Sequence, residues 1–155
     1  MLVLPERGDQ GDALREVCEV KMSAISGFPL LTATVDTVFW ATHSLPSIGV
    51  AQPHGHMFEV AAGYRHEINP HMGCTKSFPI MLSELESITH KLEGADLTAL
   101  LAPFPPTIET LACYIMAKLP PYWMFVEIAA YDHYKVRVDA NAMRSAWAEQ
   151  YRALP

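Results

Sequence analysis

Two long runs of strand-forming residues, joined by a short turn sequence, constrain the fold more than any other feature of this chain. The first run, LLTATVDTVFWATHSL, covers residues 30–45, and the second, HGHMFEVAAGYRHEI, covers residues 54–68. The first is dense in Thr, Val and aromatic residues, which favour strands, and the SIGVAQP segment between the two runs is typical of a turn. A shorter run, CEVKMSAI at residues 18–25, predicts one more strand before them.

The second half of the chain shows helical and strand patterns in succession. In IMLSELESITHKLEG, residues 80–94, apolar residues recur every three or four positions, which predicts an amphipathic helix. A second helix is predicted after Thr107, whose side chain suits the N-cap position. PYWMFVEIAAYDHYKVRVD, residues 121–139, predicts two strands, and ANAMRSAWAEQYRAL, residues 140–154, predicts a third helix. We therefore expect an α+β fold with helices on one face of an antiparallel sheet.

The length and the composition exclude several classes of protein. A chain of 155 residues suits a single domain, which we divide into a core at about 31–138, an N-terminal extension at 1–30 and the C-terminal helix. The formal net charge of −6 argues against a nucleic-acid partner, which requires clustered Lys and Arg. No apolar run approaches the ~18–20 residues that cross a bilayer, so no membrane partner is expected.

The cysteines and the N-terminus indicate the compartment. Cys18, Cys74 and Cys113 are widely spaced and form no CxxC motif, so no disulfide framework is implied. The N-terminus turns polar after four residues, unlike a secretory signal. We expect a cytoplasmic protein.

Three histidines lie close to the turn between the two long strands. His54 and His56 are two positions apart, so both project from one face of a strand, and His43 of the preceding strand can supply a third imidazole. Three imidazoles with an open fourth position are typical of a catalytic rather than a structural Zn²⁺ site. Such a metal polarises a carbonyl or hydroxyl oxygen. The same spacing also occurs in histidine pairs that bind no metal, and other divalent ions such as iron or nickel suit this ligand set.

The order of several motifs resembles a known family. FWATHSLP is followed by HGHMFEV, by SF and an amphipathic helix, by PPTIETLACYIMAKL, and by a strand that contains VEI. This succession, over about residues 35–137, is similar to the family of 6-pyruvoyl-tetrahydropterin synthase and 6-carboxy-tetrahydropterin synthase. The resemblance implies the T-fold, in which an antiparallel sheet with two helices on one face joins others around a barrel. It also implies a homo-oligomer, usually a hexamer but with a trimer or tetramer left open, whose active sites lie between subunits.

The resemblance also assigns roles to individual residues. It implies that His43, His54 and His56 are zinc ligands and that Glu127 anchors the ring of a pterin-like small-molecule substrate. A carboxylate can accept two N–H bonds from a 2-amino-4-oxo ring, and such paired bonds are strong and directional. An exposed strand glutamate is the alternative interpretation of Glu127. Thr107 and Glu109 match the family's P-T-x-E motif and are candidates for substrate binding, or are only a helix cap and a first-turn acid.

The catalytic residues of the family are missing at the matching positions. Val50 stands where the family has its proton-transferring Cys, and Ser77 replaces the Asp of its D-F motif. The family's Asp-His pair falls on Glu93 and Gly94, or in a shifted register on Asp96 with no His after it. The resemblance therefore implies an altered active site. Weak candidates for a relocated catalytic group are Cys74, Glu93, Asp96, His71 and His133.

Three functions follow from this combination of kept and missing residues. The first is a zinc-dependent lyase or cyclase that acts on a pterin-like or related heterocyclic substrate with altered catalytic residues. The second is a non-catalytic zinc- and pterin-binding paralogue with a binding or regulatory role. The third is a structural zinc site, which an open fourth position argues against.

Overall fold

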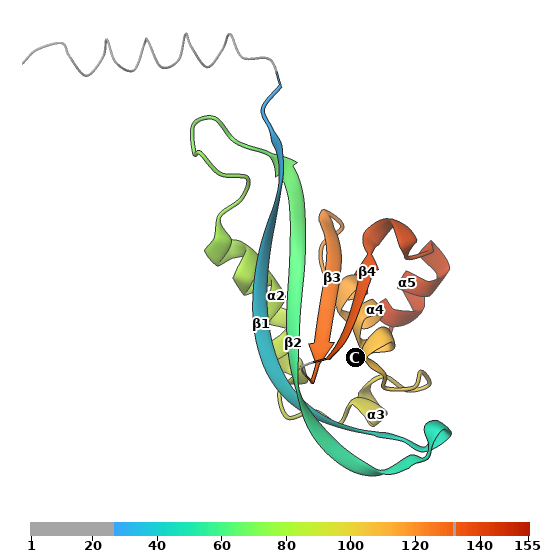
Figure 1. Ribbon diagram of the computed structural model, residues 1–155. Coiled ribbons are helices and arrows are strands. Elements are labelled where there is room, and N and C mark those ends of the chain that lie inside the picture. Colours follow the sequence, from blue (N-terminus) through green and yellow to red (C-terminus); the bar gives the residue numbers. More distant parts are fainter. Residues whose placement is uncertain (1–26, 132) are drawn as a thin grey trace, which may run out of the picture.

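The computed structural model describes residues 27–131 and 133–155, and within them it contains one antiparallel sheet in the order β1-β2-β3-β4 (Figure 1). The strands are β1 (Leu30–Leu45), β2 (Val50–Glu67), β3 (Trp123–Ala130) and β4 (Tyr134–Asp139). This arrangement confirms the predicted α+β class. The strand predicted at residues 18–25 lies outside the described residues.

The first two strands form a long hairpin whose register runs from Leu30 opposite Glu67 to His43 opposite His54. The 3-10 helix η1 (Pro46–Ile48) and Gly49, at φ 87°, reverse the chain between them. A positive φ favours glycine, and proline suits the start of a short helix. The turn is therefore shorter than the predicted segment 47–53, and β2 begins four residues before the predicted strand.

In the described part of the chain, four helices lie on one side of the sheet, three of them against the strands and the fourth against another helix (Figure 1). They are α2 (Phe78–Leu92), α3 (Leu97–Leu100), α4 (Ile108–Lys118) and α5 (Ser145–Arg152). Helix α2 packs mainly on β1, α4 packs on β3 and β4, and α5 packs on α4. The helix predicted at 140–154 is shorter than expected, because Met143 and Arg144 have extended backbones that separate the 3-10 helix η2 (Ala140–Ala142) from α5.

The hydrophobic core lies between these helices and the sheet, and the opposite sheet face is largely open. Side chains alternate along each strand, so Phe39, Phe58 and Val60 are buried against the helices. Val38 and Met57, at intervening positions, are exposed on the open face. Among the described residues, no helix combines the length and the apolar character needed to cross a membrane.

Candidate metal centre and its cavity

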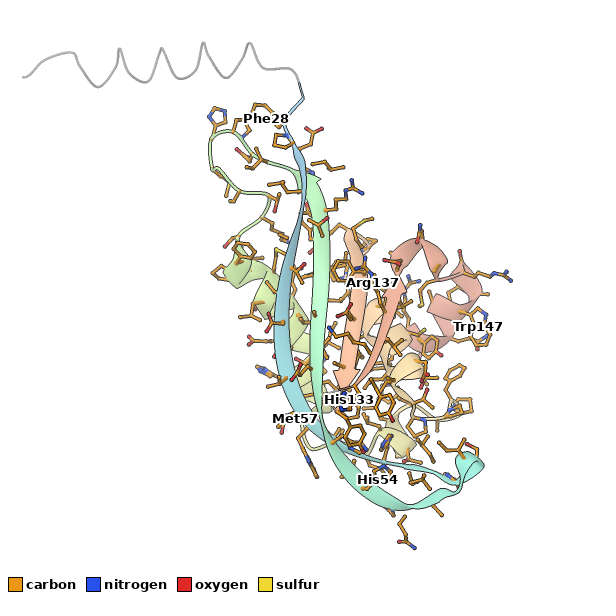
Figure 2. The ribbon with its side chains drawn as sticks, viewed as in Figure 1. Phe28, His54, Met57, His133, Arg137 and Trp147 are labelled. Carbon is orange, nitrogen blue, oxygen red and sulfur yellow. The ribbon has the colours of Figure 1, made fainter. Side chains whose placement is uncertain are left out.

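The β1–β2 hairpin brings His43, His54 and His56 together beside its turn. His43 pairs with His54 in the register, and the strand period of two places His56 on the same side as His54. One ligand nitrogen from each imidazole lies within 4.8 Å of the other two, and the ring centroids are 4.6, 4.9 and 4.7 Å apart. Figure 2 shows His54 on the curved part of the hairpin, far from Phe28 at its other end. The described residues thus contain a three-histidine group that could hold a metal ion.

Hydrogen bonds orient two of the imidazoles through their Nδ1 atoms. His43 Nδ1 lies 2.6 Å from the main-chain oxygen of Pro106, and His54 Nδ1 lies 3.1 Å from that of Gln52. A carbonyl oxygen only accepts, so each Nδ1 carries the proton and each Nε2 keeps a free lone pair. His43 Nε2 is buried and has no hydrogen-bond partner. A buried lone pair without a partner is costly, and a metal ion would satisfy it.

His56 has a different environment. Its Nε2 atom lies 2.9 Å from the hydroxyl of Tyr131, and the two ring centroids are 4.5 Å apart. Burial lowers the pKa of His56, and the nearby His43 and His54 lower it further. The lowered pKa favours the neutral imidazole, which is the form that binds a metal.

A cavity of about 500 Å³ opens beside the three imidazoles. Phe58, Ile108 and Leu45 supply apolar walls, while Tyr131 and Tyr134 bring hydroxyl groups from the hairpin between β3 and β4. Ligand pockets of small molecules are commonly of this size and combine apolar walls with few polar groups. The cavity is therefore large enough for a bicyclic heterocycle next to the candidate metal centre.

Two of the three predicted substrate-binding residues line this cavity. Thr107 caps α4 in a capping box with Thr110, and Glu109 lies in the first turn of that helix. The hydrogen bonds of the capping box already engage the Thr107 side chain, whereas the Glu109 side chain is exposed. Glu109 therefore offers a carboxylate at the mouth of the cavity.

The third, Glu127, lies on the other face of the sheet. It is opposite Ala61 in the register, whereas Ile128, opposite Val60, faces the core. Lys135 Nζ lies 3.0 Å from Oε1 of Glu127, and the two side chains form an ion pair. Glu127 lines a separate hollow of about 360 Å³ on the open face. Within one described chain, the structure does not bring Glu127 to the histidine cavity.

The five weak catalytic candidates do not line the cavity. Cys74 and His71 lie in the loop after β2, which leaves the hairpin at the end where Leu30 pairs with Glu67. Glu93 accepts a hydrogen bond from the Trp40 main-chain nitrogen at 3.0 Å, and Asp96 caps α3. His133 (labelled in Figure 2) is exposed in the turn between β3 and β4, next to Tyr134 in the sequence but not in the lining of the cavity.

Sequence reasoning missed Tyr131 and Tyr134 as residues of the site. Both come from the AAYDHYK segment, which was predicted only to contain a break between two strands. Antiparallel pairing of β3 with β2 places Ala130 opposite Phe58, so the turn that follows reaches the histidines. The sequence showed a turn in this segment, but not that the turn lies beside the histidines. That position depends on the register between β2 and β3.

Comparison with known proteins agrees with this arrangement. The profile of a family described as 6-pyruvoyl tetrahydropterin synthase matches residues 32–151. The chain belongs to that family. The match covers both long strands, the helices on the sheet and the three histidines. The T-fold expected from the family resemblance is therefore confirmed.

Solved structures of the family have the same fold. The Caenorhabditis elegans 6-pyruvoyl tetrahydropterin synthase has a TM-score of 0.68 and 18% identity, over 74% of this chain and 99% of that one. The Plasmodium vivax enzyme has a TM-score of 0.59 and 14% identity, over 71% and 97%. The Plasmodium falciparum enzyme has a TM-score of 0.56 and 16% identity, over 70% and 96%. A search of curated proteins gives no match to this chain.

Proposed function

We propose that this protein is a zinc-dependent lyase or cyclase that acts on a pterin-like or related heterocyclic substrate with altered catalytic residues. The observation that carries the proposal is the buried, unpartnered Nε2 of His43, which lies with two further imidazoles beside a cavity of about 500 Å³. Nitrogen ligands of this kind suit Zn²⁺. When bound there, the metal would polarise an oxygen of the substrate.

The residues of the cavity would bind and orient such a substrate. Phe58 and Ile108 offer apolar surface to the faces of a flat ring, and Glu109 offers a carboxylate to its N–H groups. Within one chain, Glu109 is thus better placed than Glu127 to anchor the ring. Glu127 would reach a substrate only in an assembly that brings the open sheet face of one copy to the cavity of another.

A homo-oligomer is part of the proposal. The open face of the sheet exposes Val38, Trp40 and Met57, and large exposed apolar patches mark interaction surfaces. In the register Trp40 lies opposite Met57, so these side chains form one surface rather than isolated points. Since the family resemblance implies active sites between subunits, a neighbouring copy would also complete the cavity.

A non-catalytic zinc- and pterin-binding protein is the second candidate. One observation favours it. Val50, where the family has its Cys, cannot move a proton, and none of the five relocated candidates lines the cavity of the described chain. A binder needs the cavity and the metal but no proton-transferring group.

The test compares the purified protein with His54→Ala and with His66→Ala as a matched control. His66 lies on the same strand but bonds to the Glu67 main-chain oxygen, away from the cavity. We expect about one zinc per chain in the wild type and in His66→Ala, and little in His54→Ala. Each protein is then incubated with dihydroneopterin triphosphate, the substrate suggested by the family resemblance, and the products are separated.

The outcomes separate the two candidates. Zinc-dependent turnover that is lost in His54→Ala supports the enzyme. Zinc with substrate binding but without turnover supports the non-catalytic candidate. A wild-type protein that binds no metal contradicts both.

A further inference from the structure

The hydroxyl of Tyr131 lies 2.9 Å from Nε2 of His56, one of the three histidines of the group. We propose that Tyr131 is a fourth protein ligand of this metal centre, which would close the site in the absence of substrate. The inference rests on the metal site of the proposed function. It concerns a residue for which the sequence pattern predicted no role.

The hydrogen bonds of the imidazoles show where the metal-facing atoms lie. The Nδ1 atoms of His43 and His54 are bonded to main-chain oxygens, which leaves their Nε2 atoms to face the centre. The third imidazole, His56, presents its Nε2 to the phenol of Tyr131. The hydroxyl of Tyr131 therefore lies within hydrogen-bond distance of a ring nitrogen of the group, on the wall of the same cavity.

The observed spacing suits two ligands of one ion. In a tetrahedral site with metal–ligand distances of ~2.0–2.1 Å, neighbouring ligand atoms lie about 3.3 Å apart. The hydroxyl oxygen and His56 Nε2, at 2.9 Å, are already close to that separation. Shared coordination would lengthen this pair by about 0.4 Å and would move the hydroxyl off the line of the His56 lone pair, which the ion would occupy.

The backbone of Tyr131 is also unusual. Its φ is 58°, the left-handed region that a bulky side chain rarely adopts. The side chain is 61% exposed, yet its ring packs edge-on against His56 and against Tyr134, at 4.5 and 6.0 Å between centroids. The turn thus holds an unfavourable conformation at the residue whose hydroxyl reaches the imidazoles, as happens where geometry serves a site.

Coordination would change the protonation of Tyr131. The O–H bond breaks, the proton passes to solvent, and the phenolate oxygen takes the fourth position on the metal. One negative charge then offsets part of the charge of the ion. A substrate oxygen would have to displace this phenolate before it could bind the ion.

The test uses the full-length protein, stripped of metal and titrated with Zn²⁺. The variant is Tyr131→Phe, and the matched control is Tyr134→Phe, since Tyr134 lines the same cavity from the same hairpin without a hydrogen bond to an imidazole. Two readouts are followed. One is the ultraviolet difference signal of tyrosine ionisation, and the other is Zn²⁺ affinity by competition with a chromophoric chelator.

We expect Zn²⁺ to ionise one tyrosine in the wild type and in Tyr134→Phe, and none in Tyr131→Phe. We also expect Tyr131→Phe to bind Zn²⁺ roughly 10–100-fold more weakly, the range seen when groups that support metal ligands are removed. Loading with Cu²⁺ gives a second readout. Phenolate-to-metal charge transfer should colour the wild type and Tyr134→Phe but not Tyr131→Phe.

Unchanged affinity and absence of tyrosine ionisation in a wild type that binds zinc through the histidines would overturn this inference alone. The proposed function would then stand with an open fourth position. A wild type that binds no zinc would overturn both. If zinc ionises Tyr131 but the protein shows no turnover, the inference is supported and the non-catalytic function is favoured.

Discussion

His43 Nδ1 lies 2.6 Å from the main-chain oxygen of Pro106, so the loop before α4 orients an imidazole of β1. The following residues of the same loop and helix, Thr107 and Glu109, line the cavity that the imidazole faces. The proposed metal ligand and the proposed substrate anchor are therefore linked through one short segment. Any change that moves this segment should affect both.

Metal binding should stabilise the fold, because the unfolded chain has no preformed three-histidine site. Zn²⁺ at 100 times its dissociation constant should add about 2.7 kcal/mol to the free energy of unfolding. For a domain of this size we expect the melting temperature to rise by roughly 5–11 °C. Thermal melts with zinc and with chelator would measure it. The rise in melting temperature should persist in His66→Ala and disappear in His54→Ala. If zinc also raised the melting temperature of His54→Ala, it would bind outside the three-histidine group.

Phe58 should support both the core and the metal centre. Its ring is buried, packs at 5.2 Å on Phe39, and lies 6.2 and 5.9 Å from the rings of His43 and His56. Phe58→Ala should lower the free energy of unfolding by about 3–5 kcal/mol, because it leaves a cavity. Phe58→Leu should cost about 1–1.5 kcal/mol. Denaturant unfolding measures both, and zinc titration of the folded Phe58→Leu protein should show weaker binding than in the wild type.

Gly55 should not accept a side chain, because Trp40 covers it. A Cβ atom at this position would lie 2.2 Å from Cζ2 of the Trp40 ring. We expect Gly55→Ala to displace the indole and to lower the free energy of unfolding by about 1–3 kcal/mol. It should also weaken zinc binding, because His54 and His56 flank this position. The double variant Trp40→Ala/Gly55→Ala removes the clash. It should bind zinc better than Gly55→Ala, and equal affinity would argue against this steric explanation.

Glu84 should make stability depend on pH. Burial alone would raise its pKa, but hydrogen bonds from Lys76, Tyr122 and Trp123, together with the charge of Lys76, lower it. The donor distances are 2.8, 2.6 and 3.0 Å. A lowered pKa in the folded state means that the unfolded chain takes up the proton first as pH falls. The associated stability is thus fully present above the unfolded pKa of about 4.3 and is lost progressively as pH falls from there through the lower pKa of the folded state.

Glu84→Gln tests this expectation. It should lower the free energy of unfolding at neutral pH by about 1–2 kcal/mol, since it weakens several charge-assisted hydrogen bonds on a partly exposed pair. The variant should also show a smaller loss of stability between about pH 5 and pH 3 than the wild type. Glu86→Gln, in the same helix α2, is a control. Parallel pH profiles for wild type and Glu84→Gln would contradict the assignment.

Met57 should contribute to self-association. It is exposed on the open sheet face, opposite Trp40 in the register (Figure 2). A carboxylate at this position should disfavour burial against a second copy, so Met57→Glu should shift the protein toward smaller species in sedimentation experiments. Met72→Glu, in the exposed loop after β2, is a control with the same change. If Met57→Glu leaves the sedimentation profile of an oligomeric wild type unchanged, the interface lies elsewhere.

Local patterns in the sequence predicted much of the secondary structure of this protein. The run at residues 30–45 coincides with β1, and the helical spacing after residue 80 corresponds to α2 within two residues at each end. Thr107 is the N-cap of α4 as expected. Strand periodicity placed His54 and His56 on one face, because successive side chains alternate whatever the rest of the fold does.

Which distant residues join the histidines depends on long-range strand pairing. Glu127 lies on the other face of the sheet, because the register of β3 against β2 sets which of its faces meets the core. Apolar residues occupy both faces of β3, so the sequence pattern alone did not determine that choice. Tyr131 reaches His56 because the same register places the turn after β3 beside the cavity. Local periodicity determines the direction of a side chain within its strand, whereas long-range pairing determines what that side chain meets.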